Sequence, residues 1–497
     1  MNMEYKNTFE TERLERNLQA LSVNLPEDIG RLIANGNFDL AVEVIDHRLK
    51  KPIPEIMKER LRIEKEILAR MPQEYPYSKA EAMEELRKNF RDFKEKEFHE
   101  LLLDGAFEWI YLNGEMRLKD DFIANLIKTR ENLTDRVLDE SKIAGKWENF
   151  RMLDAAVEKM KSQDEVKCRF RIRNTVSIHP DKERPGKWVQ VQMPLPLEYS
   201  QVTDFKLISS SPEGAKMAPN QCAQRTICFE GVYPAGQKFV VEYEFETTMR
   251  YWDWKMAMED GAVYGAQWRE KKMEEEQEMA GAAQMTAASI QPRPTAADLS
   301  EQLPHIAFTP YLKSIVAEAI GEETDPLKKA KKIYDYITTK VMYSFVRSYF
   351  LIPQHVNYIS TGMKGDCGLQ ALLFIAMCRI AGIPARWQSG LYTNPLTIGS
   401  HDWALFYLEE YGWLYADCSF GGAAYRAGDL KRWEFYFGNL EPYRMPAACE
   451  YQADFCFAKQ YLRSDPYDNQ NGEVEYEDAG LICGDDFESK CEMVEIS

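Results

Sequence analysis

Apolar residues recur at the helical spacing of three to four positions over the first third of this chain. Ser78 and Glu81 have the spacing of a capping box at a helix start, and Met83 and Leu86 then fall on one face of that helix. We therefore predict a helical domain over residues 1–160.

A short break in this helical pattern reads as a turn between two strands. Residues 109–118 have the sequence WIYLNGEMRL, in which Asn113 and Gly114 separate two short runs rich in apolar residues. Asn-Gly in such a setting is the strongest local signal for a β-hairpin, which we predict here. The rings of Trp109 and Tyr111 either plug the core of their own domain, which we favour, or border a substrate site.

The period changes from helix to strand over residues 166–250. Phe170 and Ile172 alternate with arginines, and the runs at 188–193 and 239–245 alternate apolar with polar positions in the same way. Proline and glycine separate these runs. Several short alternating strands with turn signals predict an antiparallel β-sandwich, in which we identify no catalytic residue.

Composition separates the rest of the chain into three further parts. A charge run followed by an Ala/Ser/Pro-rich stretch predicts a linker over residues 270–303. The last folded domain is predicted over residues 304–445. Acidic residues dominate residues 446–497, although aromatic and aliphatic residues are interspersed, so we predict an acidic extension that partly packs. The chain as a whole is predicted to be α+β.

The charge balance narrows the choice of partners. Acidic residues outnumber basic ones by 80 to 62, which gives a net charge of −18 and disfavours a nucleic-acid partner. The ten cysteines show no CxxC or Cys/His pattern, so we predict reduced thiols and no metal or other cofactor. With neither an apolar leader nor a long apolar segment, we predict a cytoplasmic protein without a membrane partner.

The first candidate for chemistry is a cysteine at the start of a predicted buried helix. Cys367 follows Gly365 and Asp366 and precedes an almost entirely apolar run that ends before Gly382 and Pro384. A helix N-terminus favours a thiolate, so we predict a lowered pKa and a nucleophilic role for Cys367. A buried, inert cysteine is the commoner alternative.

A histidine and an aspartate follow on two strands predicted to pair as a hairpin. His401 begins the first strand and Asp417 ends the second, so the two residues should lie within a few positions of facing each other. This is the placement of a general base and the carboxylate that orients it. Asp402 should point to the opposite face of its strand, and we interpret it as structural.

These residues and the motifs around them resemble the transglutaminase-like superfamily of bacterial type, whose members are relatives of the papain-like cysteine proteases. The resemblance runs from about residue 304 to 422 and includes GDCG, the helix LFIAMCRIAGIPAR, the His-x-Trp pair and GWLYAD. It implies a papain-like transglutaminase core with a triad of Cys367 as nucleophile, His401 as base and Asp417 as orienting residue. The oxyanion would be bound by the Cys367 N–H and a second donor, for which Tyr343 is a candidate; an ordinary core tyrosine is the alternative.

Two departures from the family pattern bear on the activity. Gly368 stands where the calcium-dependent animal enzymes have tryptophan, and Cys418 where bacterial relatives often have proline. The first departure favours hydrolysis over cross-linking. We therefore predict a cysteine hydrolase that cleaves peptide or isopeptide amides in a peptide or protein substrate through an acyl-enzyme thioester. The alternatives are a protein-glutamine acyl transferase or deamidase, and a non-catalytic binding protein.

Overall fold

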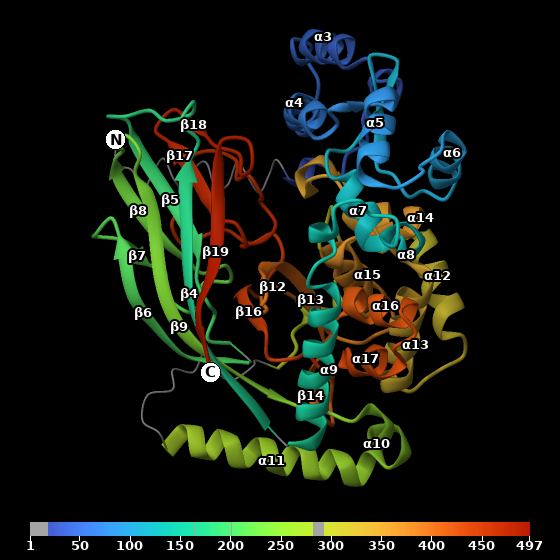
Figure 1. Cartoon of the computed structure of the whole chain (residues 1–497), viewed down its shortest axis with the longest axis vertical. Coiled ribbons are helices and arrows are strands. Elements are labelled where there is room, and N and C mark those ends of the chain that lie inside the picture. The colour runs from blue at the N-terminus through green and yellow to red at the C-terminus, as the bar shows by residue number, and fades with distance from the viewer. Residues whose placement is uncertain (1–17, 164, 200, 282–292) are drawn as a thin grey trace.

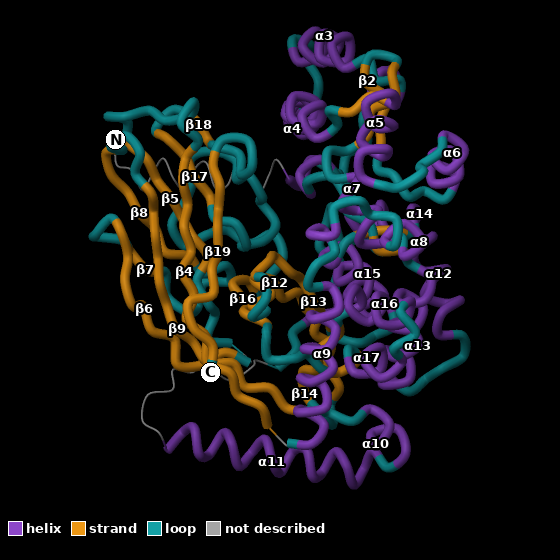
Figure 2. Tube along the Cα trace, viewed as in Figure 1, coloured by secondary structure: helices purple, strands orange, loops and turns teal. Residues whose placement is uncertain are grey.

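The chain folds into a helical part, a β-sandwich and a mixed core that lie side by side (Figure 1). The structure is a computed structural model, and it describes residues 18–163, 165–199, 201–281 and 293–497. Helices and antiparallel sheets both contribute to it (Figure 2), which confirms the predicted α+β class. No helix among the described residues combines the length and the apolar character needed to cross a membrane.

The helical part agrees with the prediction for the first 160 residues in its main features. Ser78 and Glu81 form the predicted capping box, and Asn113 and Gly114 take positive φ angles of 51° and 79° at the tip of the predicted hairpin. The helices are α2 (Glu27–Ala34), α3 (Phe38–Leu49), α4 (Glu55–Arg70), α5 (Lys79–Asn89), α6 (Glu95–Leu103), α7 (Phe122–Thr129), α8 (Glu131–Thr134) and α9 (Lys146–Ser162). The strands are β1 (Tyr77–Ser78), β2 (Trp109–Leu112) and β3 (Glu115–Leu118).

The β-sandwich consists of two antiparallel sheets with the strand orders β18-β17-β5-β8-β7 and β19-β4-β9-β6. Its strands are β4 (Glu165–Ile178), β5 (Trp188–Pro194), β6 (Val202–Ser211), β7 (Lys216–Met217), β8 (Thr226–Val232), β9 (Lys238–Arg250), β17 (Glu473–Tyr476), β18 (Ala479–Gly480) and β19 (Phe487–Ile496). The predicted strands between residues 166 and 250 are all present.

The predicted acidic extension at 446–497 contributes three strands, between residues 473 and 496, to this sandwich and is not a separate appendage. Strand β17 pairs with β5, and β19 pairs with β4 over most of its length. Val474 and Tyr476 are fully buried, while the carboxylate of Glu475 is buried beside Lys459 at 3.5 Å. The acidic composition therefore masked strands whose apolar residues fill the sandwich core.

The predicted linker at 270–303 is ordered at both of its ends. It begins inside α11 (Gly261–Gly281), the long helix at the bottom of Figure 1. Residues 282–292 lie outside the described residues. At the far end a 3-10 turn (Ala296–Leu299) is held to the core, because the buried Asp298 carboxylate is paired with Arg386 at 2.6 Å.

The core contains a five-stranded antiparallel sheet with the order β15-β14-β13-β12-β16. Its buried helix α15 packs on β13, where the rings of Phe374 and Phe406 lie 5.8 Å apart. The helices are α10 (Trp254–Glu259), α12 (Pro310–Ile320), α13 (Pro326–Lys340), α14 (His355–Gly362), α15 (Cys367–Ile380), α16 (Cys418–Arg426) and α17 (Leu430–Phe435). The strands are β10 (Met342–Tyr343), β11 (Lys364–Gly365), β12 (Ala385–Thr393), β13 (Ile398–Leu408), β14 (Gly412–Ala416), β15 (Phe437–Gly438) and β16 (Arg444–Ala448).

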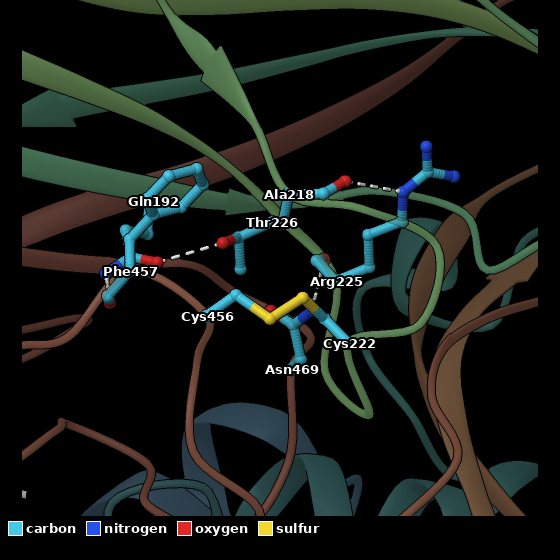
Figure 3. The surroundings of a disulfide bond; sticks show 8 residues. All are labelled: Gln192, Ala218, Cys222, Arg225, Thr226, Cys456, Phe457 and Asn469. Carbon is cyan, nitrogen blue, oxygen red and sulfur yellow. Dashed lines mark hydrogen bonds between the residues drawn. A yellow bond between two sulfur atoms is a disulfide. The ribbon is translucent and has the colours of Figure 1, made fainter.

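One pair of cysteines is joined, which corrects the expectation that all ten are reduced thiols. Cys222, in the loop between β7 and β8, forms a disulfide with Cys456, and the two Cα atoms are 6.0 Å apart (Figure 3). A pairing across 234 residues leaves no local spacing pattern in the sequence. The disulfide ties the segment between β16 and β17 to the sandwich.

Candidate active site

Cys367 is the first residue of helix α15, as the sequence predicts. The side chain of Asp366 caps this helix by accepting a hydrogen bond from the N–H of Leu369. The apolar residues that follow are buried between the core sheet and the surrounding helices, which anchors the helix and fixes the place of the half-buried thiol.

The thiol of Cys367 faces a carboxylate. Its Sγ lies 3.5 Å from Oδ2 of Asp402, to which it can donate its proton. Burial and the negative charges of Asp402 and Asp366 raise the pKa of Cys367 well above its usual value. The predicted lowering of this pKa is therefore wrong: desolvation and two adjacent carboxylates outweigh the effect of the helix N-terminus.

The imidazole of His401 is held by Asp417, as the predicted pairing of their strands requires. Nε2 of His401 and Oδ2 of Asp417 are 2.7 Å apart, and both side chains are buried. The same carboxylate lies 3.1 Å from the guanidinium of the fully buried Arg444. Its other oxygen accepts hydrogen bonds from the hydroxyl of Ser419 and the N–H of Phe420, each at 2.9 Å.

These contacts determine which nitrogen of His401 carries the proton. Burial alone would raise the pKa of Asp417, but His401 and Arg444 lower it to about 2, so this carboxylate is ionised and can only accept. Nε2 must therefore be the protonated nitrogen. Burial lowers the pKa of His401 to about 4, so near neutral pH Nδ1 carries a lone pair, and no hydrogen-bond partner for it occurs among the described residues.

The structure does not join the thiol to this imidazole: no hydrogen bond between Cys367 and His401 is found in the part of the chain that the structure describes. The cause is the alternation of side chains along β13. Asp402 shares a face of the strand with Phe406, the face on which α15 packs, whereas His401 points to the other. Alternation was predicted from the sequence, but the face that receives the helix was not.

Gly368 leaves the space in which Asp402 approaches the thiol. A Cβ atom at this position would lie 2.1 Å from the hydroxyl of Tyr349 and 2.7 Å from Oδ2 of Asp402. The Tyr349 hydroxyl in turn donates a hydrogen bond of 2.7 Å to Asp366. A tryptophan here, as in the calcium-dependent animal enzymes, would require both side chains to move.

A residue from the C-terminal segment also reaches the site, which sequence reasoning missed. The side-chain amide of Gln470 donates to Oδ1 of Asp402 at 2.5 Å and to the carbonyl of His401 at 3.2 Å. Nothing in the local sequence marks Gln470, because it is brought here by the pairing of β17 with β5. No group of three or more His, Cys, Asp or Glu side chains among the described residues is arranged to hold a metal ion.

Tyr343 lies beside the segment that leads into Cys367. Strand β10 runs parallel to β11, and Tyr343 is paired with Gly365. Its hydroxyl accepts a hydrogen bond of 3.1 Å from Nζ of Lys128, a residue of helix α7 in the helical part. Lys128 is a second residue that sequence reasoning missed, because it comes from a part of the chain with no recognisable motif.

Comparison with known proteins supports the resemblance seen in the sequence. Residues 313–418, which include Cys367, His401 and Asp417, match the family described as transglutaminase-like superfamily. No curated protein matches the chain.

Among solved structures, the chain is similar to a "putative cysteine protease" from Cytophaga hutchinsonii, with 14% identity, 67% of this chain and 92% of that one covered, and a TM-score of 0.40. It is also similar to the periplasmic domain of TgpA from Pseudomonas aeruginosa, with 14% identity and a TM-score of 0.27. That match covers 56% of this chain and 96% of the TgpA domain.

Proposed function

Since residues 313–418 form a transglutaminase-like domain, we propose that this chain is a cysteine hydrolase of peptide or isopeptide amide bonds. Cys367 would be the nucleophile, His401 the general base and Asp417 the residue that orients the imidazole. The observation that carries the proposal is the buried 2.7 Å contact between His401 and Asp417, one residue along β13 from the contact between Asp402 and Cys367.

The reaction begins with the transfer of the thiol proton. Asp402 holds the thiol in the resting state. Because His401 points to the other face of β13, both the Cys367 side chain and the start of β13 would have to move to bring the thiol to Nδ1 of His401. The thiolate then attacks the carbonyl carbon, and His401 gives the proton to the amide nitrogen as the carbon–nitrogen bond breaks. Water attacks the resulting thioester while His401 takes its proton, the carbon–sulfur bond breaks, and the thiol is restored.

In this proposal, two groups would stabilise the negative oxygen of the tetrahedral intermediates. The N–H of Cys367 lies in the first turn of α15, where backbone donors have no partner within the helix. Tyr343 accepts a hydrogen bond from Lys128, so its own hydroxyl proton is left to donate. We therefore retain Tyr343 as the candidate second oxyanion donor.

Incubation with a peptide library, in the presence and absence of a primary amine, tests this activity. Hydrolysis predicts products whose mass increases by one water molecule whether or not the amine is present, and no product with the Cys367→Ser variant. Amine incorporation at glutamine would instead show an acyl transferase. An intact protein that never forms an acyl adduct at Cys367 would contradict the enzyme proposal and favour a binding protein.

The compartment in which this activity occurs is a separate question. The sequence predicts a cytoplasmic protein, whereas a disulfide such as Cys222–Cys456 persists mainly in oxidising environments. We propose that the protein works in an oxidising compartment. Peptide mapping without reductant, on protein trapped with an alkylating agent at cell lysis, should recover the joined peptides; two alkylated thiols would restore the cytoplasmic prediction.

A further inference from the structure

Helix α7 of the helical part carries a cation to the edge of the candidate active site. Nζ of Lys128 lies 3.1 Å from the hydroxyl of Tyr343, and it sits over the rings of Tyr343 and Phe345 at 4.4 and 5.2 Å from their centroids. These contacts favour one direction for a side chain that is exposed to solvent. Lys128 lies outside residues 313–418, so the family domain alone does not contain this charge.

Lys128 differs from its basic neighbours because it has no carboxylate partner. Arg347 and Lys364, which also lie where the helical part meets the core, contact the buried Glu108 at 2.8 and 3.5 Å. Arg130 lies 3.7 Å from Asp104. In the described part of the chain no carboxylate is within 4.0 Å of the Lys128 ammonium group, which is left with an aromatic hydroxyl and two rings.

The charges around Cys367 show what this cation can do. Asp366 and Asp402 both oppose ionisation of the thiol, while Lys128 favours it. Tyr343, which holds Lys128, is paired with Gly365, two residues before Cys367, so the ammonium group lies beside the segment that leads into the thiol. The charge of Lys128 also lowers the pKa of His401, so the ammonium group acts on both the thiol and the imidazole.

We propose that Lys128 is the counter-charge of the Cys367 thiolate, so that the helical part completes the active site of the transglutaminase-like domain. This inference rests on the proposed role of Cys367 as nucleophile. Lys128 has no recorded contact with the sulfur atom and acts through the field of its charge, held in place by Tyr343. The helical part is therefore expected to be required for thiol reactivity.

The test is the pH dependence of Cys367 alkylation by iodoacetamide, followed by peptide mapping in the full chain. Lys128→Met keeps the length of the side chain and removes the charge, so the apparent pKa of Cys367 should rise. Labelling near neutral pH should then slow by about tenfold for each unit of that rise. Lys128→Arg should restore labelling to near the wild-type rate. Added salt should narrow the difference between wild type and Lys128→Met.

Lys79→Met is the matched control, because Lys79 lies in the same part of the chain and over an aromatic ring, that of Phe98, at 5.5 Å. It should leave the labelling profile of Cys367 unchanged. A Lys128→Met profile that coincides with the wild type would overturn the proposal. Alkylation does not require the enzyme to turn over a substrate. If Lys128→Met shifts the pH profile of Cys367 labelling but the wild type hydrolyses no amide, the proposed hydrolase activity is refuted and the proposed role of Lys128 stands.

Discussion

The charged groups around Cys367 change its pKa in opposite directions: Asp402 and Asp366 raise it and Lys128 lowers it. The thiol contacts the carboxylate of Asp402 at 3.5 Å, and burial together with the charges of Asp402 and Asp366 raises its pKa. The resting site therefore holds a protonated thiol. A substrate that displaces the thiol from Asp402, or neutralises that carboxylate, would release a stronger nucleophile at the moment of binding.

Asparagine substitutions at Asp402 and Asp417 should separate the roles of the two carboxylates. Burial and the charge of Asp366 raise the pKa of Asp402 itself well above its usual value. Asp402→Asn removes a carboxyl group whose ionised form opposes ionisation of the thiol, so the pKa of Cys367 should fall and its alkylation near neutral pH should become faster. Asp417→Asn removes the charge that selects the Nε2–H tautomer of His401, so amide hydrolysis should drop by orders of magnitude. Alkylation rates, hydrolysis rates and thermal unfolding of both variants provide the measurements.

The same pair of variants can contradict the assignment of His401 as the base. If Asp402→Asn abolishes hydrolysis as completely as Asp417→Asn does, while both proteins unfold at the wild-type temperature, Asp402 is the group that takes the thiol proton. If Asp417→Asn instead unfolds the protein, the role of Asp417 is structural, since it also caps α16 through the N–H of Phe420.

At the scale of whole elements, the predictions that succeeded rest on local periodicity. The hairpin tip at Asn113 and Gly114 and the buried helix that begins at Cys367 are each encoded within a stretch of at most 14 residues. Pairings between distant segments leave no such trace. For this reason β17 and β19 were missed as strands of the sandwich, and so was the face of β13 on which Asp402 meets Cys367.

The hairpin of β2 and β3 presents its two aromatic rings in different settings. Trp109 is half-buried: it packs against the core of the helical part and also lines a cavity of about 300 Å³ with Arg347 and Lys364. Tyr111 is 44% exposed, although the two rings are in edge contact at 5.4 Å. The structure thus favours a packing role for Trp109, whereas Tyr111 lies largely on the surface.

Alanine substitutions should reveal this difference between the two rings. Trp109→Ala removes a large, partly buried side chain, so the free energy of unfolding should fall by about 1–3 kcal/mol, less than for a fully buried aromatic. Tyr111→Ala should change it by no more than about 0.5 kcal/mol, as for most surface positions. Chemical denaturation measures both values. Equal losses, or a larger loss for Tyr111→Ala, would contradict this interpretation.

Across the whole molecule, three parts of the chain converge on one site. The transglutaminase-like domain supplies Cys367 and His401, the helical part supplies Lys128, and the segment between β16 and β17 supplies Gln470. That last segment is fastened to the sandwich by the Cys222–Cys456 disulfide. The site is therefore sensitive to contacts that lie outside the family domain.

A buried pair of histidines fastens the same C-terminal segment to the core. The rings of His305 and His355 stack with their centroids 3.9 Å apart, and both side chains are fully buried. His355 accepts a hydrogen bond from the hydroxyl of Tyr451 at Nδ1 and donates one of 2.8 Å to the carbonyl of Tyr349 from Nε2. Both ring nitrogens are thus used by the neutral form, and a second proton on Nδ1 would remove the acceptor of the Tyr451 hydroxyl proton.

This arrangement predicts that the protein loses stability in mild acid. Burial lowers the pKa of His355 to about 3 and that of His305 well below its usual value. In the unfolded chain each histidine binds a proton near pH 6.5, so below that pH the unfolded state binds more protons than the folded state. Each buried histidine should therefore cost about 1.4 kcal/mol per pH unit as the pH falls from about 6.5 toward its folded pKa.

Replacing one member of the pair isolates its contribution from those of the buried carboxylates. His355→Gln keeps an acceptor and a donor but does not titrate, so its unfolding free energy should fall less steeply between pH 6.5 and 4 than that of the wild type, by about one proton. His99→Gln, at an exposed histidine on α6, should leave the slope unchanged. Denaturant unfolding at several pH values gives the slopes; if those of His355→Gln and the wild type are parallel, the buried pair does not govern acid sensitivity.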